Sequence, residues 1–382
     1  MGRFSRCIMT TLATVLMAAG TVWAYEPKTL ELGAKAPDFS LPGVDGRNYA
    51  LCDFADAEVL VLIFTCNHCP TARAYEDRIK KLSADYKDKG VAVVCISSND
   101  PCALRIDEMA WSDVGDSFED MKIRAEDKEF NFPYLYDGDT QAVAKAYGPV
   151  TTPHTFIFDK ERKLRFVGRI DSSEWRERPD AVQDARNAID ALLAGDKPPV
   201  EKTKTFGCST KWSDKRESVK KEREQLAKEK VTVEMIDAEG VKELVKNEAG
   251  KLRLINVWAT WCGPCKVELP ELVKIHWIYR NRKTTEFEVV TISADPPKIK
   301  EAVLEFLKEY HASCKNYLFD SDDKYQLIEA VDKQWAGGIP YTILIEPSGK
   351  IIYRQMGQIE PLAVKQAIIG YYAAFLPWWV SE

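Results

Sequence analysis

The chain has 382 residues, more than one ordinary domain of ~100–200 residues, so we expect two domains. Hydrophobic residues make up 45% and charged residues 29%, an ordinary globular composition that excludes disordered, collagenous and multi-span membrane proteins. The net charge of −6 offers no basic field for nucleic acid, and no glycine-rich phosphate-binding motif predicts a nucleotide or flavin.

The N-terminal segment, residues 1–24, has the pattern of an export signal. Two arginines and no acid precede an apolar run at 8–19, which is shorter than the roughly 20 residues of a membrane span. Such a segment is typical of a signal peptide, here cleaved after Ala24, and an uncleaved anchor is the alternative. We therefore expect a periplasmic or secreted protein, in a compartment where disulfides form.

The rest of the chain contains an internal repeat. Five features recur in the same order: an apolar run ending in Cys-x-x-Cys, a helical pattern, a buried strand, a short Tyr-Leu strand and a strand containing proline. The first copy has them at 59–69, 72–86, 91–101, 134–139 and 151–158. The second copy has them at 252–265, 267–279, 287–297, 317–323 and 338–345. Strands that alternate with helices predict an α/β fold with a sheet covered on both faces.

A charged segment separates the copies. We expect domains at 27–199 and 231–376, joined by a linker at 200–230 that includes Cys208. Residues 211–230 hold 13 charged residues of 20 and no Gly or Pro, which favours a solvated helix or charged spacer. A helix packed on the first domain is the alternative.

The two Cys-x-x-Cys motifs, Cys66–Cys69 and Cys262–Cys265, carry the predicted chemistry. Each follows a strand and begins a helix, so we expect an exposed first sulfur, a buried second sulfur and a thiolate favoured by helix N-terminal amides. The spacing lets the second thiol resolve a mixed disulfide. Zinc is disfavoured because the pairs are 196 residues apart, and haem attachment is excluded because no His follows either motif. Purely structural disulfides remain an alternative.

The second copy resembles a known family. Residues 231–372 resemble the TlpA/ResA-like thioredoxin family in WATWCGPCKVELP at 258–270 and GIPYT at 338–342. The resemblance implies a thioredoxin fold and thiol–disulfide exchange.

The resemblance also implies roles for individual residues. Cys262 would be the nucleophile, Cys265 the resolving thiol and Pro340 the cis-proline that faces the disulfide. Glu268 matches a glutamate implicated in proton handling, and the alternative is a first-turn charge that interacts with the helix dipole. Asn256 stands where the general thioredoxin pattern has a buried Asp.

The first copy resembles a neighbouring branch. Residues 27–212 are similar to redoxins of the peroxiredoxin-like type (alkyl hydroperoxide reductase/thiol-specific antioxidant, AhpC/TSA). The similarity lies in LGAKAPDFSL at 32–41, FTCNHCP at 64–70, TPH at 152–154 and FGCSTKW at 206–212. It implies a second thioredoxin-like fold, with Pro153 as the counterpart of the C-terminal cis-proline.

The peroxiredoxin pattern Pro-x-x-x-Thr/Ser-x-x-Cys is incomplete. With Cys69 as the peroxidatic residue, Leu62 replaces the Pro and Cys66 replaces the Thr/Ser. The hydroxyl that would orient peroxide is missing, which favours a dithiol exchanger with Cys66 as the nucleophile.

His68 directly precedes the second cysteine of the first motif. We expect its imidazole to stabilise the Cys66 thiolate, lower its pKa and raise the reduction potential. An exposed loop histidine without influence is the alternative. The N-terminal pair would then be the more oxidising, and electrons would pass to it, or to a shared client, from the C-terminal pair.

Outside the motifs, the predicted mature chain has five cysteines. They are Cys52, Cys95, Cys102, Cys208 and Cys314. We expect Cys95 to be buried in a core strand. A Cys52–Cys208 clasp and a role for Cys208 as an extra resolving thiol both remain open.

These observations predict two tandem thioredoxin-like α/β folds in an exported thiol–disulfide oxidoreductase. Its partners would be protein thiol or disulfide clients and an upstream thiol reductant, with no cofactor or metal. One alternative is a thiol peroxidase with antioxidant activity, recycled by the C-terminal domain. Another is a copper-binding assembly protein that uses Cys66, Cys69 and either His68 or His154, and a third is a scaffold with one redox-inactive repeat.

Overall fold

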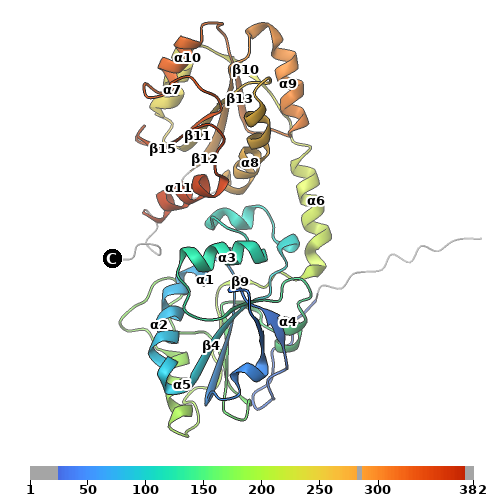
Figure 1. The fold of residues 1–382 in the computed structure, drawn as a ribbon, viewed down its shortest axis with the longest axis vertical. Coiled ribbons are helices and arrows are strands. Elements are labelled where there is room, and N and C mark those ends of the chain that lie inside the picture. Colours follow the sequence, from blue (N-terminus) through green and yellow to red (C-terminus); the bar gives the residue numbers. More distant parts are fainter. Residues whose placement is uncertain (1–24, 282–285, 375–382) are drawn as a thin grey trace, which may run out of the picture.

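A computed structural model describes residues 25–281 and 286–374. The predicted signal peptide and the last two residues of the predicted second domain lie outside these ranges. Figure 1 shows two sheet-and-helix units, the N-terminal one below and the C-terminal one above, connected by helix α6 (Arg216–Leu226). In the part of the chain that is described, no helix combines the length and apolarity needed to cross a bilayer.

The N-terminal unit is built around a five-stranded sheet. Its strands, in spatial order, are β5 (Tyr134–Tyr136), β4 (Val91–Ser97), β3 (Val59–Thr65), β7 (His154–Phe158) and β8 (Leu164–Gly168). Its helices are α1 (Pro70–Ala74), α2 (Glu76–Tyr86), α3 (Phe118–Asp127), α4 (Ala142–Tyr147) and α5 (Asp184–Leu193). The central strand β3 runs parallel to β4 and antiparallel to β7.

The alternation of side chains along β3 explains why helices cover both faces. Val59, Val61 and Ile63 pack with α2, α3 and α5, whereas Leu60 and Leu62 pack with α4 on the opposite face. Figure 1 shows α2 and α5 on one side of the sheet and α4 on the other. The predicted doubly covered sheet is confirmed.

The C-terminal unit repeats this arrangement with one more strand. Its order is β10 (Glu234–Ile236), β13 (Lys315–Phe319), β12 (Phe287–Ser293), β11 (Leu252–Trp258), β14 (Tyr341–Ile345) and β15 (Ile351–Met356). Its helices are α7 (Ala238–Lys246), α8 (Gly263–Tyr279), α9 (Lys300–Glu309), α10 (Lys324–Val331) and α11 (Pro361–Ala373). Strands β13-β12-β11-β14-β15 correspond to β5-β4-β3-β7-β8, so the internal repeat is a repeated fold.

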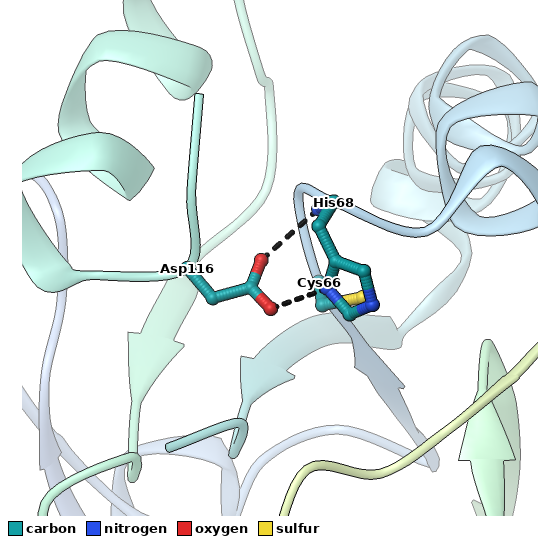
Figure 2. Close-up of side chains that lie close together, drawn as sticks. All are labelled: Cys66, His68 and Asp116. Carbon is teal, nitrogen blue, oxygen red and sulfur yellow. Dashed lines mark hydrogen bonds and ion pairs between the residues drawn. The ribbon is translucent and has the colours of Figure 1, made fainter. Parts of the chain in front are cut away.

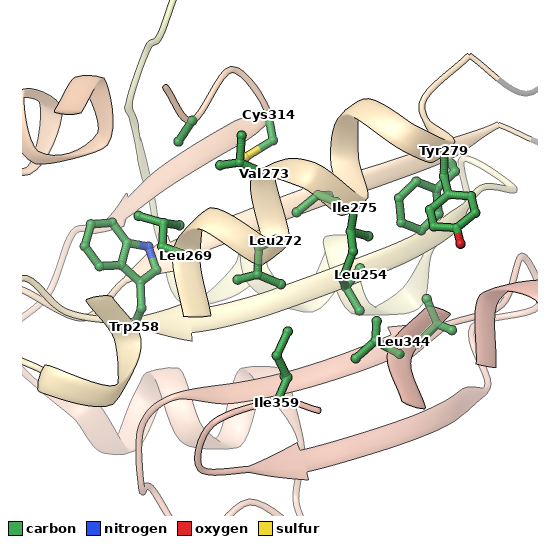
Figure 3. Close-up of a cluster of buried hydrophobic side chains, with 14 of the residues drawn as sticks. Leu254, Trp258, Leu269, Leu272, Val273, Ile275, Tyr279, Cys314, Leu344 and Ile359 are labelled. Carbon is green, nitrogen blue, oxygen red and sulfur yellow. The ribbon is translucent and has the colours of Figure 1, made fainter. Parts of the chain in front are cut away.

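One face of the C-terminal sheet packs against the long helix α8. Figure 3 shows Leu272 and Ile275 of α8 on the side of the helix that meets Leu254 of β11, with Leu344 of β14 next to it. All four side chains are buried. This apolar contact holds the start of α8, where the second Cys-x-x-Cys motif lies, firmly on the end of β11.

Short elements complete the units. The short strands are β1 (Ser40–Pro42), β2 (Asn48–Ala50), β6 (Thr151–Thr152) and β9 (Cys208–Ser209). The 3-10 helices are η1 (Leu51–Phe54), η2 (Lys87–Lys89), η3 (Pro101–Ala103), η4 (Asp107–Trp111), η5 (Ser213–Lys215) and η6 (Pro297–Ile299). The pair β6-β9 is separate from the main sheet and brings the linker back onto the N-terminal unit.

The charged linker forms a helix that is anchored at its beginning. Trp212 is buried in the N-terminal core, with its ring 4.6 Å from the ring of Tyr25, and Val219 is buried in the second turn of α6. The other residues of α6 are exposed or half-buried. The prediction of a helix is confirmed. The alternative, a helix packed on the N-terminal unit, holds for the beginning of α6.

The two units touch through η4 and α8. Ala110 of η4 is buried in the C-terminal hydrophobic cluster, and the hydroxyl of Tyr279 in α8 donates a 2.9 Å hydrogen bond to the Ser112 carbonyl. The segment around η4 therefore belongs to the N-terminal unit in sequence and packs on the C-terminal unit in space.

Candidate functional site

The C-terminal motif lies at the start of α8. Cys262 caps the helix and forms a disulfide with Cys265. Cys262 is 5% exposed and Cys265 is 1% exposed. The prediction that the first sulfur is exposed is therefore wrong, because both cysteines lie in the hydrophobic cluster of this unit. The Ile339–Pro340 bond is cis, as the family resemblance implied.

Glu268 lies one helical turn after Cys265 and is buried. Its two oxygens accept hydrogen bonds from the Asn256 side-chain amide at 2.7 Å and from the Ile359 backbone amide at 2.9 Å. Burial raises the pKa of Glu268 to about 7. The two hydrogen bonds lower the pKa, but their effect is smaller than that of burial. A buried carboxyl group whose pKa lies near neutrality can accept or release a proton at physiological pH. The alternative role, a first-turn charge on the helix dipole, does not fit because Glu268 lies beyond the first turn of α8.

The N-terminal motif meets its helix differently. Helix α1 begins at Pro70, so its capping residue is the second cysteine, Cys69, rather than the first. The backbone amide of Ala72 points to the Cys69 sulfur at 3.5 Å. The helix amides that favour a thiolate therefore act on Cys69, which occupies the structural position that Cys262 has in the other copy.

These contacts favour Cys69 as the thiolate of this site, whereas we predicted Cys66. Burial, together with the neighbouring Cys69 and Asp116, raises the pKa of the Cys66 thiol. Burial also opposes ionisation of Cys69, but hydrogen bonds from Cys208 and Cys66 and the charge of His68 hold its pKa below the usual value. Pro70 was the available signal, because proline is favoured at the first position of a helix.

Both sulfurs of the N-terminal motif contact Thr152, the residue before Pro153. The Cys66 sulfur lies 3.1 Å from the Thr152 hydroxyl, and the Cys69 sulfur lies 3.2 Å from the Thr152 carbonyl oxygen. The Thr152–Pro153 bond is cis. The residue before the cis-proline therefore lies against both thiols. The predicted exposure of Cys66 is wrong, since it is 3% exposed.

His68 is buried and paired with Asp116, as Figure 2 shows. The imidazole Nδ1 lies 2.5 Å from the Asp116 carboxylate, and the His68 backbone amide donates to the same carboxylate at 3.0 Å. Burial lowers the pKa of His68, but the charge and hydrogen bond of Asp116 outweigh it and raise the pKa overall. His68 is therefore not the exposed loop histidine of the alternative. The prediction that it lowers the pKa of Cys66 is also wrong, because the pKa of Cys66 is raised and the charge of His68 acts on Cys69. This positive charge favours the Cys69 thiolate.

Sequence reasoning missed Asp116. It lies in the loop before α3, 48 residues after His68, and no repeat or motif marks it. Asn99 donates a 2.8 Å hydrogen bond to its carboxylate, and the Asn67 backbone amide donates another at 2.9 Å. Only the folded chain brings these groups together.

The segment around η4 closes over this site. The Ser112 hydroxyl donates to the Asn67 carbonyl at 3.1 Å, and the Asn67 side-chain amide donates to the Gly115 carbonyl at 2.7 Å. The same segment contacts α8 of the C-terminal unit. These two hydrogen bonds hold the η4 segment against the loop that carries Cys66 and Cys69.

The fold brings together only some of the residues that we proposed as copper ligands. Among the described residues, Cys66, His68 and Asp116 have potential ligand atoms within 4.8 Å of one another. His154 is not in that group: its Nδ1 accepts a hydrogen bond from Val150, and burial lowers its pKa to about 3. Because His68 and Asp116 are in direct contact, we interpret these three residues as an ion pair that lies beside the Cys66 thiol.

The remaining cysteines are distributed as follows. Cys95 is buried, as predicted, and burial raises the pKa of its thiol. Cys314 is also buried, whereas Cys52 and Cys102 are exposed. The Cys52–Cys208 clasp is not formed, because Cys208 lies half-buried against the Cys66–Cys69 pair.

Comparison with known proteins agrees with the repeated fold. The Redoxin family model matches residues 31–185 and 228–368. A thiol-disulfide oxidoreductase ResA of Bacillus cereus is 29% identical over 164 residues, 41% of this chain and 82% of that protein. The thiol:disulfide interchange protein DsbE of Pseudomonas fluorescens biotype C is 30% identical over 127 residues, 33% of this chain and 64% of that protein.

A solved structure is also similar. The crystal structure of an uncharacterized conserved protein from Geobacillus kaustophilus is 38% identical, with a TM-score of 0.44, and the match covers 50% of this chain and 96% of that one. The two segments that match the family model contain the two sheets and both cysteine pairs. The chain therefore belongs to the Redoxin family, as a fusion of two tandem thioredoxin-like folds.

Proposed function

We propose that this protein is an exported thiol–disulfide oxidoreductase that exchanges disulfides with protein clients through both of its Cys-x-x-Cys pairs. The observation that carries the proposal is the position of the pairs: each has one cysteine capping a helix at the end of a central strand. The names of the ResA and DsbE relatives point to the same chemistry. An upstream thiol reductant would return the C-terminal pair to its dithiol form.

At the C-terminal site, the reduced pair acts as a reductase. The Cys262 thiolate attacks a client disulfide, which forms a mixed disulfide and releases one client sulfur as a thiolate. The Cys265 thiol then loses its proton to Glu268 and attacks the Cys262 sulfur, which restores the Cys262–Cys265 disulfide and releases the second client sulfur. One client disulfide is reduced and one protein dithiol is oxidised.

At the N-terminal site, the same chemistry runs with the roles of the cysteines exchanged. Cys69 is the stabilised thiolate and Cys66 its partner. A thiolate stabilised by His68 and by helix amides favours the dithiol over the disulfide, so this pair accepts electrons more readily than an unassisted pair. The N-terminal site is accordingly the more oxidising of the two.

Reduction of insulin disulfides tests the proposal. The mature chain is compared with a Cys262→Ser/Cys265→Ser variant and a Cys66→Ser/Cys69→Ser variant. We expect each double variant to retain part of the exchange activity and a quadruple variant to lose it. Full activity in the quadruple variant would show that other groups perform the reaction, and no activity in the wild type would reject the proposal.

A thiol peroxidase is the second candidate, favoured by the Cys69 thiolate at the start of α1. Attack of Cys69 on a hydroperoxide gives a sulfenic acid and an alcohol or water. The Cys66 thiol then condenses with the sulfenic acid, which forms a disulfide and releases water. Peroxide consumption by the Cys262→Ser/Cys265→Ser variant with an added thiol reductant, abolished by Cys69→Ser, would assign this antioxidant activity.

Export is proposed from the N-terminal segment. A chain carrying its natural N-terminus, produced in a bacterial host, is expected in the periplasmic fraction with Tyr25 as its first residue. Recovery of the full-length chain from the cytosol would contradict this part of the proposal.

A further inference from the structure

The N-terminal site holds a third cysteine that neither copy of the repeat predicts. Strand β9 pairs antiparallel with β6, which places Cys208 directly opposite Thr152. Thr152 is the residue that contacts both Cys66 and Cys69. The pairing of two short strands therefore brings a cysteine from the linker, 139 residues after Cys69, onto the dithiol.

The contacts of Cys208 are with the redox pair itself. Its backbone amide donates a 3.2 Å hydrogen bond to the Cys69 sulfur. Its side chain packs on a small cluster made of Cys66, Cys69 and Ala72. A cysteine that serves only as packing needs none of these sulfur contacts.

The three sulfurs differ in their access to solvent. Cys66 is 3% exposed and Cys69 is fully buried, while Cys208 is half-buried. Because Cys66 and Cys69 are both buried, their sulfurs offer almost no surface to a protein client. Of the three thiols, Cys208 is the one that such a client meets first.

We propose that Cys208 is a third redox thiol of the N-terminal site and carries thiol–disulfide exchange between protein clients and the buried Cys66–Cys69 pair. The inference rests on the proposed exchange function of this site and adds the route by which clients reach it. Cys69 is the shared sulfur, bonded either to Cys66 in the buried disulfide or to Cys208 in the accessible one.

The steps balance without any further oxidant. The Cys208 thiol loses its proton and attacks Cys69 of the buried disulfide, so that Cys69–Cys208 forms and Cys66 leaves and takes up a proton. A client thiolate attacks the Cys208 sulfur, and Cys69 leaves as its stabilised thiolate. A second client thiolate then attacks the client sulfur bound to Cys208. The client disulfide forms, and Cys208 leaves and is protonated.

Peptide mapping of the oxidised full chain tests the inference. A Cys52→Ser/Cys262→Ser/Cys265→Ser background removes the C-terminal pair and an exposed cysteine that shares a tryptic peptide with the motif. Trypsin then separates residues 48–73, with Cys66 and Cys69, from residues 205–211, with Cys208. The Cys66→Ser substitution is then introduced into this background, and the protein is oxidised with glutathione disulfide. Peptides 48–73 and 205–211 are expected to be joined by a Cys69–Cys208 disulfide.

A kinetic arm separates a redox role from mere proximity. In the same background, oxidised protein is mixed with reduced ribonuclease as the protein dithiol. Cys208→Ser is expected to slow its oxidation about tenfold or more while leaving the Cys66–Cys69 disulfide able to form. Exposed Cys102→Ser is the matched control and is expected to leave the rate unchanged.

The outcomes distinguish the two levels of the account. If the Cys66–Cys69 disulfide forms and oxidises ribonuclease equally fast without Cys208, the inference is overturned and the exchange function stands. If neither disulfide forms and no exchange occurs in the background variant, the N-terminal exchange function fails and the inference falls with it. A linked Cys69–Cys208 peptide together with slowed exchange supports the proposal.

Discussion

At the scale of single residues, the two motifs use opposite cysteines. Cys262 caps α8, whereas Cys69 caps α1, so the thiolate is favoured at the first position of one motif and at the second position of the other. The sequence was sufficient to propose the four cysteines, Glu268 and His68 as candidate site residues. It was insufficient to find Asp116, because that residue is distant in the chain and has no counterpart in the second motif.

The charge of His68 gives a prediction for Cys69. His68→Asn removes the imidazolium and keeps a side chain that can donate to Asp116. Because the positive charge no longer favours the thiolate, we expect the pH midpoint of Cys69 alkylation to move to higher pH and its rate at pH 7 to fall several-fold. Peptide mass spectrometry of the reduced Cys262→Ser/Cys265→Ser protein gives the rate.

The control for this change is His311→Asn. His311 is exposed in the C-terminal unit and has a φ of +54°, a conformation that asparagine tolerates well. It is expected to leave the Cys69 profile unchanged. An unchanged profile in His68→Asn as well would show that His68 does not set the state of Cys69.

Glu268 predicts a dependence of stability on pH. Its pKa is about 7 in the folded chain against an ordinary value of 4.5, so the folded state binds the proton more tightly than the unfolded state between these values. The contribution of Glu268 to the free energy of unfolding is therefore fully present below pH 4.5, and it is lost as the pH rises through 7. Between pH 5 and 8 the loss is about 2–3 kcal/mol.

Urea unfolding of Glu268→Gln at several pH values measures this contribution. In the variant, the free energy of unfolding is expected to fall by about 2–3 kcal/mol less than in the wild type between pH 5 and 8, because an amide does not ionise in this range. Glu271→Gln, on a partly exposed side chain of the same helix, is the matched control. An equal fall with pH in Glu268→Gln and in wild type would contradict the assigned pKa.

At the scale of elements, the repeat was readable because each copy has the same succession of buried strands and helices. Both sheets have the same strand order around β3 and β11. The pair β6-β9 was not predictable, since two-residue strands carry no periodicity and β9 lies in the linker. The start of α1 was predictable from Pro70, had that proline been taken as the first helical residue.

Gly207 is required for the β6-β9 pairing. Its φ is +124°, and a Cβ atom there would lie 2.1 Å from the Thr152 carbonyl oxygen. We expect Gly207→Ala to detach β9, to cost about 1–3 kcal/mol of stability and to reduce the yield of the Cys69–Cys208 disulfide. Thermal unfolding and peptide mapping measure both effects.

Gly195→Ala is the matched control for backbone strain. Gly195 has a φ of +80°, but a Cβ atom there would meet no heavy atom within 4 Å. This variant is expected to lose some stability and to keep a normal disulfide yield. If Gly207→Ala also kept a normal yield, the β6-β9 pairing would not be what positions Cys208.

At the scale of the whole molecule, the C-terminal unit supports the cover of the N-terminal site. The η4 segment contacts α8 on one side and the Cys66–Cys69 loop on the other. Composition and motifs predicted two domains and said nothing about their contact, because neither η4 nor the outer face of α8 carries a recognisable pattern. The contact packs the η4 segment of the N-terminal unit against α8 of the C-terminal unit.

Separation of the units should expose the N-terminal thiols. Ala110→Asp places a charge in the buried contact between η4 and α8, where an unpaired charge costs several kcal/mol, so we expect the segment to leave α8. Alkylation of Cys66 and Cys69 should then become faster. Exposed Ala249→Asp is the control, and equal alkylation rates in the two variants would show that the contact does not protect the site.

The reduction potentials of the two cysteine pairs are the decisive measurement. They test whether one chain carries two separate redox sites and whether the N-terminal site is the more oxidising. Each pair is equilibrated in glutathione buffers in a variant that lacks the other pair, and free thiols are counted by alkylation. We expect a higher reduction potential for Cys66–Cys69 than for Cys262–Cys265. Equal potentials or the reverse order would contradict this expectation.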